Sequence, residues 1–365
     1  MRAATKLVKA VFGAPDPGAP FLPGPVFASV YQHAGDPTGA PFTYGRTSNP
    51  TWSGYEGALA ELEGGPCLVF ASGMAAVSAV LCSDVRRGDV VVLPSDGYHG
   101  ARSLTETYLR ELGAEVRLLA TAGGDADAAL HGASLVLLES PANPSLDVCD
   151  IRSLCRAAHA AGARVAVDNS TATVLGQQPL ALGADYSLGS DSKALTGHSD
   201  LLLGHVAVRD ADLLPALAAW RSQIGAVAGP METWLAHRSL ATLDVRLQRQ
   251  CSTALAVASA LRDHPAVLRC RYPGMPGDPA HGVASQQMTL FGPVLGFTLA
   301  GQAEAERWLS DVGLVLPATS FGGVHTTAER RARWGSDDVP PGFIRLSIGL
   351  EDPVDLVADI LQALP

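Results

Sequence analysis

One lysine stands apart in a chain that otherwise carries its positive charge on arginine. Among 26 Lys and Arg residues the lysines are Lys6, Lys9 and Lys193. Arginine serves a cationic contact equally well, but only lysine supplies a primary amine whose pKa falls on desolvation and that condenses with an aldehyde. Lys193 lies between apolar segments, beside Ser190 and Ser192. This setting predicts a lysine that holds a cofactor aldehyde, and the alternative is a surface lysine with its stem along apolar surface.

A sheet of short apolar strands is expected to position this lysine. Between residues 64 and 210 such runs alternate with helical patterns, which is typical of βαβ units. Nearly continuous apolar strands indicate a mostly parallel sheet covered on both faces, hence an α/β fold. The predicted strands are 67–71, 89–94, 115–120, 134–140, 164–169, 184–189 and 204–209.

The residues that directly follow these strands are the ones that meet ligands in an open α/β sheet. Ser72, Gly73 and Met74 open a helix whose free N–H groups would bind a phosphate, unless this is an ordinary turn. Tyr98 stands among small residues that leave room for a flat ligand, although a lone Tyr often belongs to the core. Asp168 ends a buried strand, where a protonated ring nitrogen would offset its burial, or where it could cap the next segment.

Together these side chains fit one ligand, pyridoxal 5′-phosphate. Its needs are an amine for the aldehyde, a carboxylate for the ring nitrogen and a phosphate site. Asn143 also follows a strand, although an Asn before proline is usually a turn residue. The sequence contains no GxxxxGK[ST], GxGxxG or HExxH motif, and its ten histidines show no metal-ligand spacing. No metal is therefore predicted.

The composition indicates which classes of binding partner and which cellular compartment are to be expected. The net charge of −10, without a basic run interleaved with aromatics, argues against nucleic acid and against an anionic membrane. No segment reaches membrane-spanning length, and the first apolar run is too short for a signal sequence. Six scattered cysteines without a CxxC pair indicate a reducing cytoplasm.

Three parts of the chain are expected. Residues 1–43 form an extended arm, because prolines recur from position 15 to position 41 and prevent a regular helix. Residues 44–228 form the large domain. After a turn at GPME (229–232), residues 229–365 form a smaller α/β domain. Its predicted elements are helices at 238–264, 302–311 and 353–363 and strands at 267–272, 294–299 and 343–349.

From about Tyr44 to Asp352 the chain resembles the cysteine and methionine metabolism family of pyridoxal phosphate enzymes, which includes cystathionine γ-lyase, cystathionine γ-synthase and methionine γ-lyase. The resemblance implies fold type I, the aspartate aminotransferase-like architecture. It rests on several long motifs in the family's order: YGRTSNPT (44–51), ASGMAAV (71–77), ESPANPSLDVCDI (139–151), VDN (167–169), GADYSLGSDSKALTGHSD (183–200), YPGMP (272–276) and FIRLSIGLED (343–352).

The resemblance also implies a role for each site residue. Lys193 would carry the cofactor and remove the substrate α-proton, Asp168 would pair with the ring nitrogen, and Tyr98 would stack on the ring and act as an acid. The phosphate would be held by Gly73, Met74, Ser190 and Ser192, and by Tyr44 and Arg46 of a neighbouring subunit. Substrate would be bound by Arg345, Asn143, Ser320 and His325. A homotetramer built from two dimers that share active sites is implied.

The implied activity is cleavage of the bond between the γ-carbon and sulfur in L-cystathionine or a related amino acid. The alternatives are γ-replacement on an O-acylated homoserine, as in cystathionine γ-synthase, and a cofactor-binding module that has lost catalysis. Gly100 stands where methionine γ-lyases have Cys, which argues against that member. His325 replaces an acidic residue of the family's SLGGxESL segment, and Ser170 and Thr171 replace Thr and Phe. These departures leave the distal group of the substrate open.

Overall fold

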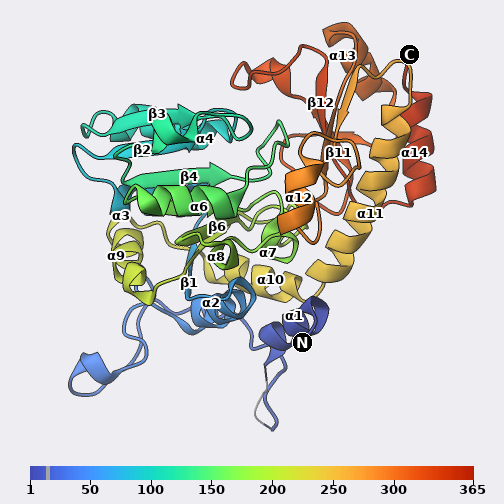
Figure 1. Ribbon diagram of the computed structural model, residues 1–365. Helices are drawn as coiled ribbons and strands as arrows, with labels where there is room; N and C mark the ends of the chain where they lie inside the picture. The colour runs from blue at the N-terminus through green and yellow to red at the C-terminus, as the bar shows by residue number, and fades with distance from the viewer. Residues whose placement is uncertain (14–16) are drawn as a thin grey trace.

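The computed structural model describes residues 1–13 and 17–365 and contains two β-sheets (Figure 1). The larger sheet has the strand order β1-β7-β6-β5-β4-β2-β3, and only β7 runs antiparallel to its neighbours. The expected α/β fold with a mostly parallel sheet is thus confirmed. Its strands are β1 (Cys67–Phe70), β2 (Val90–Pro94), β3 (Glu115–Leu119), β4 (Leu135–Glu139), β5 (Arg164–Asp168), β6 (Tyr186–Ser190) and β7 (Gly204–Val208).

Helices cover both faces of this sheet, as its apolar strands require. On one face Phe70 and Leu93 pack with Val80 of α3 and Leu217 of α9 in a single hydrophobic cluster. On the other face the strands pack against α5 and α6, and β1 and β7 pack against α2, α1 (Ala3–Phe12) and α10 (Pro230–Leu240). The helices of this part are α2 (Pro50–Glu63), α3 (Gly73–Asp84), α4 (His99–Leu104), α5 (Ala126–Leu130), α6 (Ile151–Ala160), α7 (Thr173–Gly176), α8 (Pro179–Leu182) and α9 (Leu214–Ile224).

The smaller sheet follows the order β10-β11-β12-β9-β8 and is mostly antiparallel. Three of its strands were expected, whereas β10 and β11 were not, because they are short or polar and show no apolar alternation. The elements are β8 (Arg269–Arg271), α12 (His281–Gln287), β9 (Val294–Thr298), α13 (Gln302–Asp311), β10 (Leu316–Pro317), β11 (Thr327–Arg330), β12 (Phe343–Ser347) and α14 (Pro353–Gln362).

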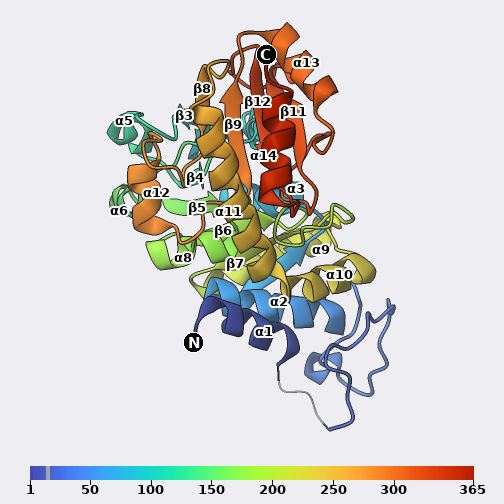
Figure 2. The same cartoon turned by 90° about the vertical axis from the view of Figure 1, so that its right-hand side faces the viewer.

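Two helices connect the sheets. The GPME segment is not a turn: Pro230 opens α10 (Pro230–Leu240), where its fixed φ suits the first helical position. A separate helix, α11 (Leu243–Arg262), follows, so the predicted helix at 238–264 is two. Figure 2 shows α11 running from beside α1 and α2 up to the smaller sheet. Its Leu247 belongs to the core beneath the large sheet and its Val257 to the core of the smaller one.

The prediction that residues 1–43 form an extended arm without regular helix is wrong for residues 3–12. Helix α1 (Ala3–Phe12) precedes every proline of the segment and contains residues with good helix propensity. Leu7 and Val11, four residues apart on one face, are buried in the core shared with α2 and α10. Of the expected arm, residues 17–43 contain one 3₁₀ turn, Pro37–Gly39, while Pro15 lies outside the described residues.

Candidate functional site

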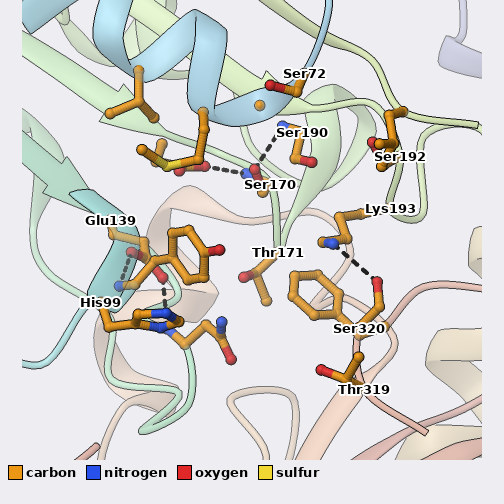
Figure 3. Close-up of a pocket in the computed structure, with 18 of the residues that line it drawn as sticks. Ser72, His99, Glu139, Ser170, Thr171, Ser190, Ser192, Lys193, Thr319 and Ser320 are labelled. Atoms are coloured by element: carbon orange, nitrogen blue, oxygen red, sulfur yellow. Dashed lines mark hydrogen bonds between the residues drawn. The ribbon is translucent and has the colours of Figure 1, made fainter. Parts of the chain in front are cut away.

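A cavity of about 380 Å³ opens at the carboxyl ends of β4, β5 and β6, between the two sheets. Figure 3 shows its polar lining, with Lys193 facing Ser320 and the serines gathered near the start of α3. Such a volume suits a small ligand. The lining residues are Ser72, Gly73, Met74, Val77, Tyr98, His99, Glu139, Asn143, Asp168, Ser170, Thr171, Ser190, Ser192, Lys193, Leu202, Thr319, Ser320, Phe321, Arg331 and Arg345.

One end of the cavity is built to receive an anion. Helix α3 starts there at Gly73, and Ser72 caps it by accepting a hydrogen bond from Ala75 N–H at 3.1 Å. A Cβ added at Gly73 would lie 2.6 Å from Ser190 Cβ, so only glycine permits this close approach. Free N–H groups of the first turn and nearby hydroxyls could hold a phosphate.

The amine of Lys193 projects into the middle of the cavity. It donates a hydrogen bond to Ser320 Oγ at 2.9 Å and lies 5.4 Å from the ring centroid of Phe321. Burial lowers the pKa of Lys193, and the nearby Arg345 lowers it further, while Asp168 opposes the shift. A lowered pKa increases the fraction of neutral, nucleophilic amine. Ser320 holds its place with φ of +74°, a strained backbone conformation that clusters at functional sites.

Two carboxylates lie side by side at the sheet edge. Asp168 and Glu139 are paired in register as the last residues of β5 and β4. Burial raises the pKa of Asp168. Burial and the charge of Asp168 raise the pKa of Glu139 to about 8. Glu139 accepts backbone N–H bonds from Tyr98 at 2.6 Å and from Asn143 at 2.7 Å, so it fixes two further lining residues.

At the opposite end stands a buried guanidinium. Arg345 donates to Asn143 Oδ1 at 2.8 Å and to the Ser320 carbonyl at 2.8 Å. Burial lowers the pKa of Arg345 to about 10, which still leaves it charged at neutral pH. A charged fork with remaining N–H groups is the side chain that best binds a carboxylate. The cavity thus brings together a helix start, an amine, a carboxylate and a guanidinium, which could hold a phosphate, an aldehyde, a cationic ring nitrogen and a carboxylate respectively.

Comparison with known proteins shows to which family the chain belongs. The model of the Cys/Met metabolism PLP-dependent enzyme family matches residues 26–365. The chain belongs to this family. It is 57% identical to a Streptomyces coelicolor protein named "Putative cystathionine gamma-lyase", over 99% of this chain and 93% of the relative. It is 36% identical to the cystathionine gamma-synthase of Mycobacterium tuberculosis H37Rv, over 96% and 94%.

Solved structures agree with the sequence comparison. A crystal structure described as a cystathionine gamma lyase from Micromonospora echinospora superposes with a TM-score of 0.92 at 39% identity. The match covers 100% of this chain and 99% of that one. The fold is therefore that of the family's pyridoxal phosphate enzymes.

The residues present fit the family's cofactor, pyridoxal 5′-phosphate. The start of α3 matches its phosphate, the amine of Lys193 matches its aldehyde, and the half-buried Asp168 provides an anion for its ring nitrogen. Because burial penalises the charge on Asp168, a cationic partner there would be stabilising. Tyr98, which is 36% exposed, lines the same space.

Three predicted residues do not line this cavity. Arg46 donates to the Ser222 carbonyl at 2.8 Å and stacks over Tyr44, and both lie away from the lining. His325 is exposed and outside the lining as well. A single chain does not test a role of Tyr44 and Arg46 in a neighbouring subunit, so that role stays a prediction.

Two charged residues of the cavity wall, Glu139 and Arg331, were not predicted from the sequence. Glu139 follows the rule that had selected Asp168, since both end buried strands, and it could have been found in that way. Arg331 had no such signal, because it lies in a charged RRARWG segment that reads as a surface loop. In the structure it is buried and lines the cavity.

Behind the phosphate end lies a buried network that the sequence did not reveal. His205 on β7 bonds through Nδ1 to Asp191 Oδ1 at 2.5 Å and through Nε2 to Glu63 Oε1 at 3.2 Å. Tyr55 donates its hydroxyl to the other Asp191 oxygen at 2.9 Å. Burial alone disfavours an imidazolium, but the two carboxylates outweigh it and raise the pKa of His205 to about 10.

This network predicts a pH dependence of stability. Because the pKa of His205 rises from 6.5 to about 10 on folding, its stabilising effect is complete below pH 6.5 and is lost progressively up to about pH 10. His205→Gln is expected to remove this slope and to lower the free energy of unfolding at neutral pH by about 3–5 kcal/mol, since two carboxylates lose their partner. Urea unfolding at fixed pH values measures both.

His33→Gln, at an exposed histidine, serves as the control and should leave the pH profile unchanged. An unaltered slope in the His205 variant would show that the imidazole is neutral in the folded protein.

Proposed function

We propose that this chain is a pyridoxal phosphate-dependent carbon–sulfur lyase that cleaves the bond between the γ-carbon and sulfur of L-cystathionine. With water, the products are cysteine, 2-oxobutanoate and ammonia. The observation that carries the proposal is the convergence of Lys193, Asp168, Tyr98 and Arg345 on one cavity. The substrate class agrees with the names of the relatives.

The cofactor supplies an electron sink that stabilises negative charge at the substrate α-carbon. Asp168 would hold a positive charge on the ring nitrogen. Lys193, with its amine free in the cavity, would be the base that takes the α-proton, and its lowered pKa favours that role. Arg345 and Asn143 fix the α-carboxylate, so that the α-proton faces the amine.

Departure of the γ-substituent requires the loss of a second proton, from the β-carbon, whose electron pair then expels the sulfur, and it requires a proton donor at the sulfur. We assign the role of donor to the Tyr98 phenol, which lines the same cavity and is held through its backbone by Glu139. A thiolate leaves more easily when it is protonated on departure. Apolar Phe321 and Leu202 line the remaining wall.

The second candidate is γ-replacement on an O-acylated homoserine, because relatives at 36% identity are named cystathionine gamma-synthase. The same residues would serve both reactions, which differ in whether water or a thiol reacts after the leaving group has departed. Release of 2-oxobutanoate from L-cystathionine is therefore compared with formation of cystathionine from cysteine and acylated homoserine. Faster elimination from cystathionine is the expected result, and replacement that outpaces it tenfold or more would favour the synthase.

We also propose a homo-oligomer, a tetramer of active-site-sharing dimers, located in the cytoplasm. Exposed apolar side chains in the N-terminal segment, Phe21 and Phe27 at 76% and 71%, support an interface there. Tyr44 and Arg46 would then reach a neighbour's phosphate site. The free cysteines of the described residues suit a reducing compartment. A sedimentation coefficient of a monomer would contradict the assembly, and secretion in a cell fractionation would contradict the location.

Two further features bear on the organisation of the chain. Across residues 1–13 and 17–365, every helix is too short or too polar to span a bilayer. The division of the chain into parts at residues 43 and 228 remains a proposal. Helix α11 follows the second boundary but contributes side chains both to the core beneath the large sheet and to the core of the smaller sheet.

A further inference from the structure

A buried carboxylate joins two arginines at the carboxylate-binding end of the cavity. Strand β11 pairs with β12 so that Glu329 lies opposite Arg345. Glu329 Oε2 accepts from Arg345 Nη2 at 3.1 Å and from Arg331 Nη1 at 2.8 Å. Its other oxygen accepts from Trp334 Nε1 at 2.6 Å. The two guanidinium groups are therefore neighbours held by one shared oxygen.

Arg331 is fixed from a second side. Its Nε and Nη2 donate to Asp337 Oδ2 at 2.8 and 2.5 Å. Together the two arginines and the two carboxylates are neutral, which makes their burial tolerable. The segment that carries them is tied to the other rim of the cavity, because Arg102 of α4 donates to the Ser336 carbonyl at 3.0 Å.

Each arginine keeps donors for a ligand. A guanidinium has five N–H groups. Arg331 uses three on Glu329 and Asp337, and Arg345 uses three on Asn143, Ser320 and Glu329. Two N–H groups therefore remain on each side chain, and both side chains line the cavity. The remaining donors are Nε–H and one Nη1–H on Arg345, and one Nη1–H and one Nη2–H on Arg331. An α-carboxylate bound at Arg345, beside Asn143 and Ser320, leaves the donors of Arg331 free.

We propose that Arg331 is a specificity-determining residue that binds a second carboxylate, carried by the γ-substituent of the substrate. This inference deepens the proposed function. Its substrate class is an amino acid with a carboxylate at each end, which includes L-cystathionine and excludes L-methionine as a good ligand. The segment that departs from the family pattern thus contributes Arg331 to the cavity, whereas its His325 is exposed and does not line it.

A matched pair of uncleavable ligands tests the proposal without turnover. L-2-Aminosuberate has the length of cystathionine, with methylene in place of sulfur and a terminal carboxylate, and its ω-amide lacks only that charge. Calorimetric titration of the holoenzyme is expected to show tighter binding of the diacid by tenfold to a hundredfold, the usual worth of a charged hydrogen bond. Arg331→Gln should abolish the difference while the amide binds as before.

Arg333→Gln is the matched control, since that arginine lies at the surface and contacts Glu306 only at 3.8 Å. Should Arg331→Gln fail to fold, the double variant R331Q/D337N keeps the local charge balance and is titrated instead. Equal affinity of the wild type for both ligands, or a preference that survives in the variant, would overturn the proposal and leave Arg331 as a structural counter-ion. Failure to cleave cystathionine would instead refute the proposed function, because the titration does not require catalysis.

Discussion

Replacement of Lys193 by alanine is expected to abolish the visible absorbance of the bound cofactor and to reduce kcat by about 10³-fold or more. The amine would be lost both as the point of attachment and as the base for the α-proton. No neighbouring lysine can replace it, since Lys6 and Lys9 both lie in α1. Absorbance spectra and 2-oxobutanoate release measure the two effects.

Lys193→Arg sharpens this test. It retains a cation near Asp168 but offers no nucleophilic amine, so it should behave like the alanine variant. Lys9→Ala, at an exposed position of α1, should leave both the spectrum and the rate unchanged. If the arginine variant kept more than a tenth of the activity, Lys193 would be an electrostatic contact and the assigned role would be wrong.

Asp168→Asn is expected to lower kcat by about 10² to 10³, while affinity for the substrate carboxylate changes little. The carboxylate is held by the Ser170 N–H at 3.0 Å, so the amide would keep the position and lose only the charge. Without that charge the ring nitrogen would release its proton more easily and the electron sink would weaken. Steady-state kinetics should therefore show a fall in kcat with a nearly constant KM.

Asp168→Glu should recover part of the rate, because it restores an anion at the end of β5. Asp150→Asn changes the same side chain at the exposed cap of α6 and should leave kcat unaltered. A large rise in KM with an intact kcat would place Asp168 in substrate binding instead.

The larger sheet was predictable because each of its strands can be recognised from a short stretch of sequence. Each buried strand is a short apolar run, and the residue that ends it, such as Asp168, falls at the ligand edge by topology alone. Helix α1 was not predicted, although the prolines that exclude a helix begin only at residue 15 and the ten residues of α1 contain none. Whether Leu7 and Val11 have a core to pack against is decided by α2 and α10, which a local pattern does not show.

The arginine end of the cavity was predictable only in part. The family resemblance singled out Arg345, but Glu329 and Arg331 depend on the register between β11 and β12. Strand β11 reads TAER, whose charged residues are buried because each meets an opposite charge. Hydrophobic periodicity gives no signal for such a strand, since ion pairing rather than apolar burial stabilises it.

Helix α11 sets the span of the catalytic cavity before any substrate arrives. Arg246 donates to the carbonyls of Ala194 and Leu195, next to Lys193 in the chain. One turn further on, Gln250 donates to the carbonyls of Gly323 and Ile348, in the two segments that carry Ser320 and Arg345. Lys193 and Arg345 thus lie on segments that are both hydrogen-bonded to helix α11. Because these segments are already fixed, little conformational entropy is lost when an amino acid binds between them. Relatives are expected to diverge at the leaving-group end, whose walls are not fastened to this helix.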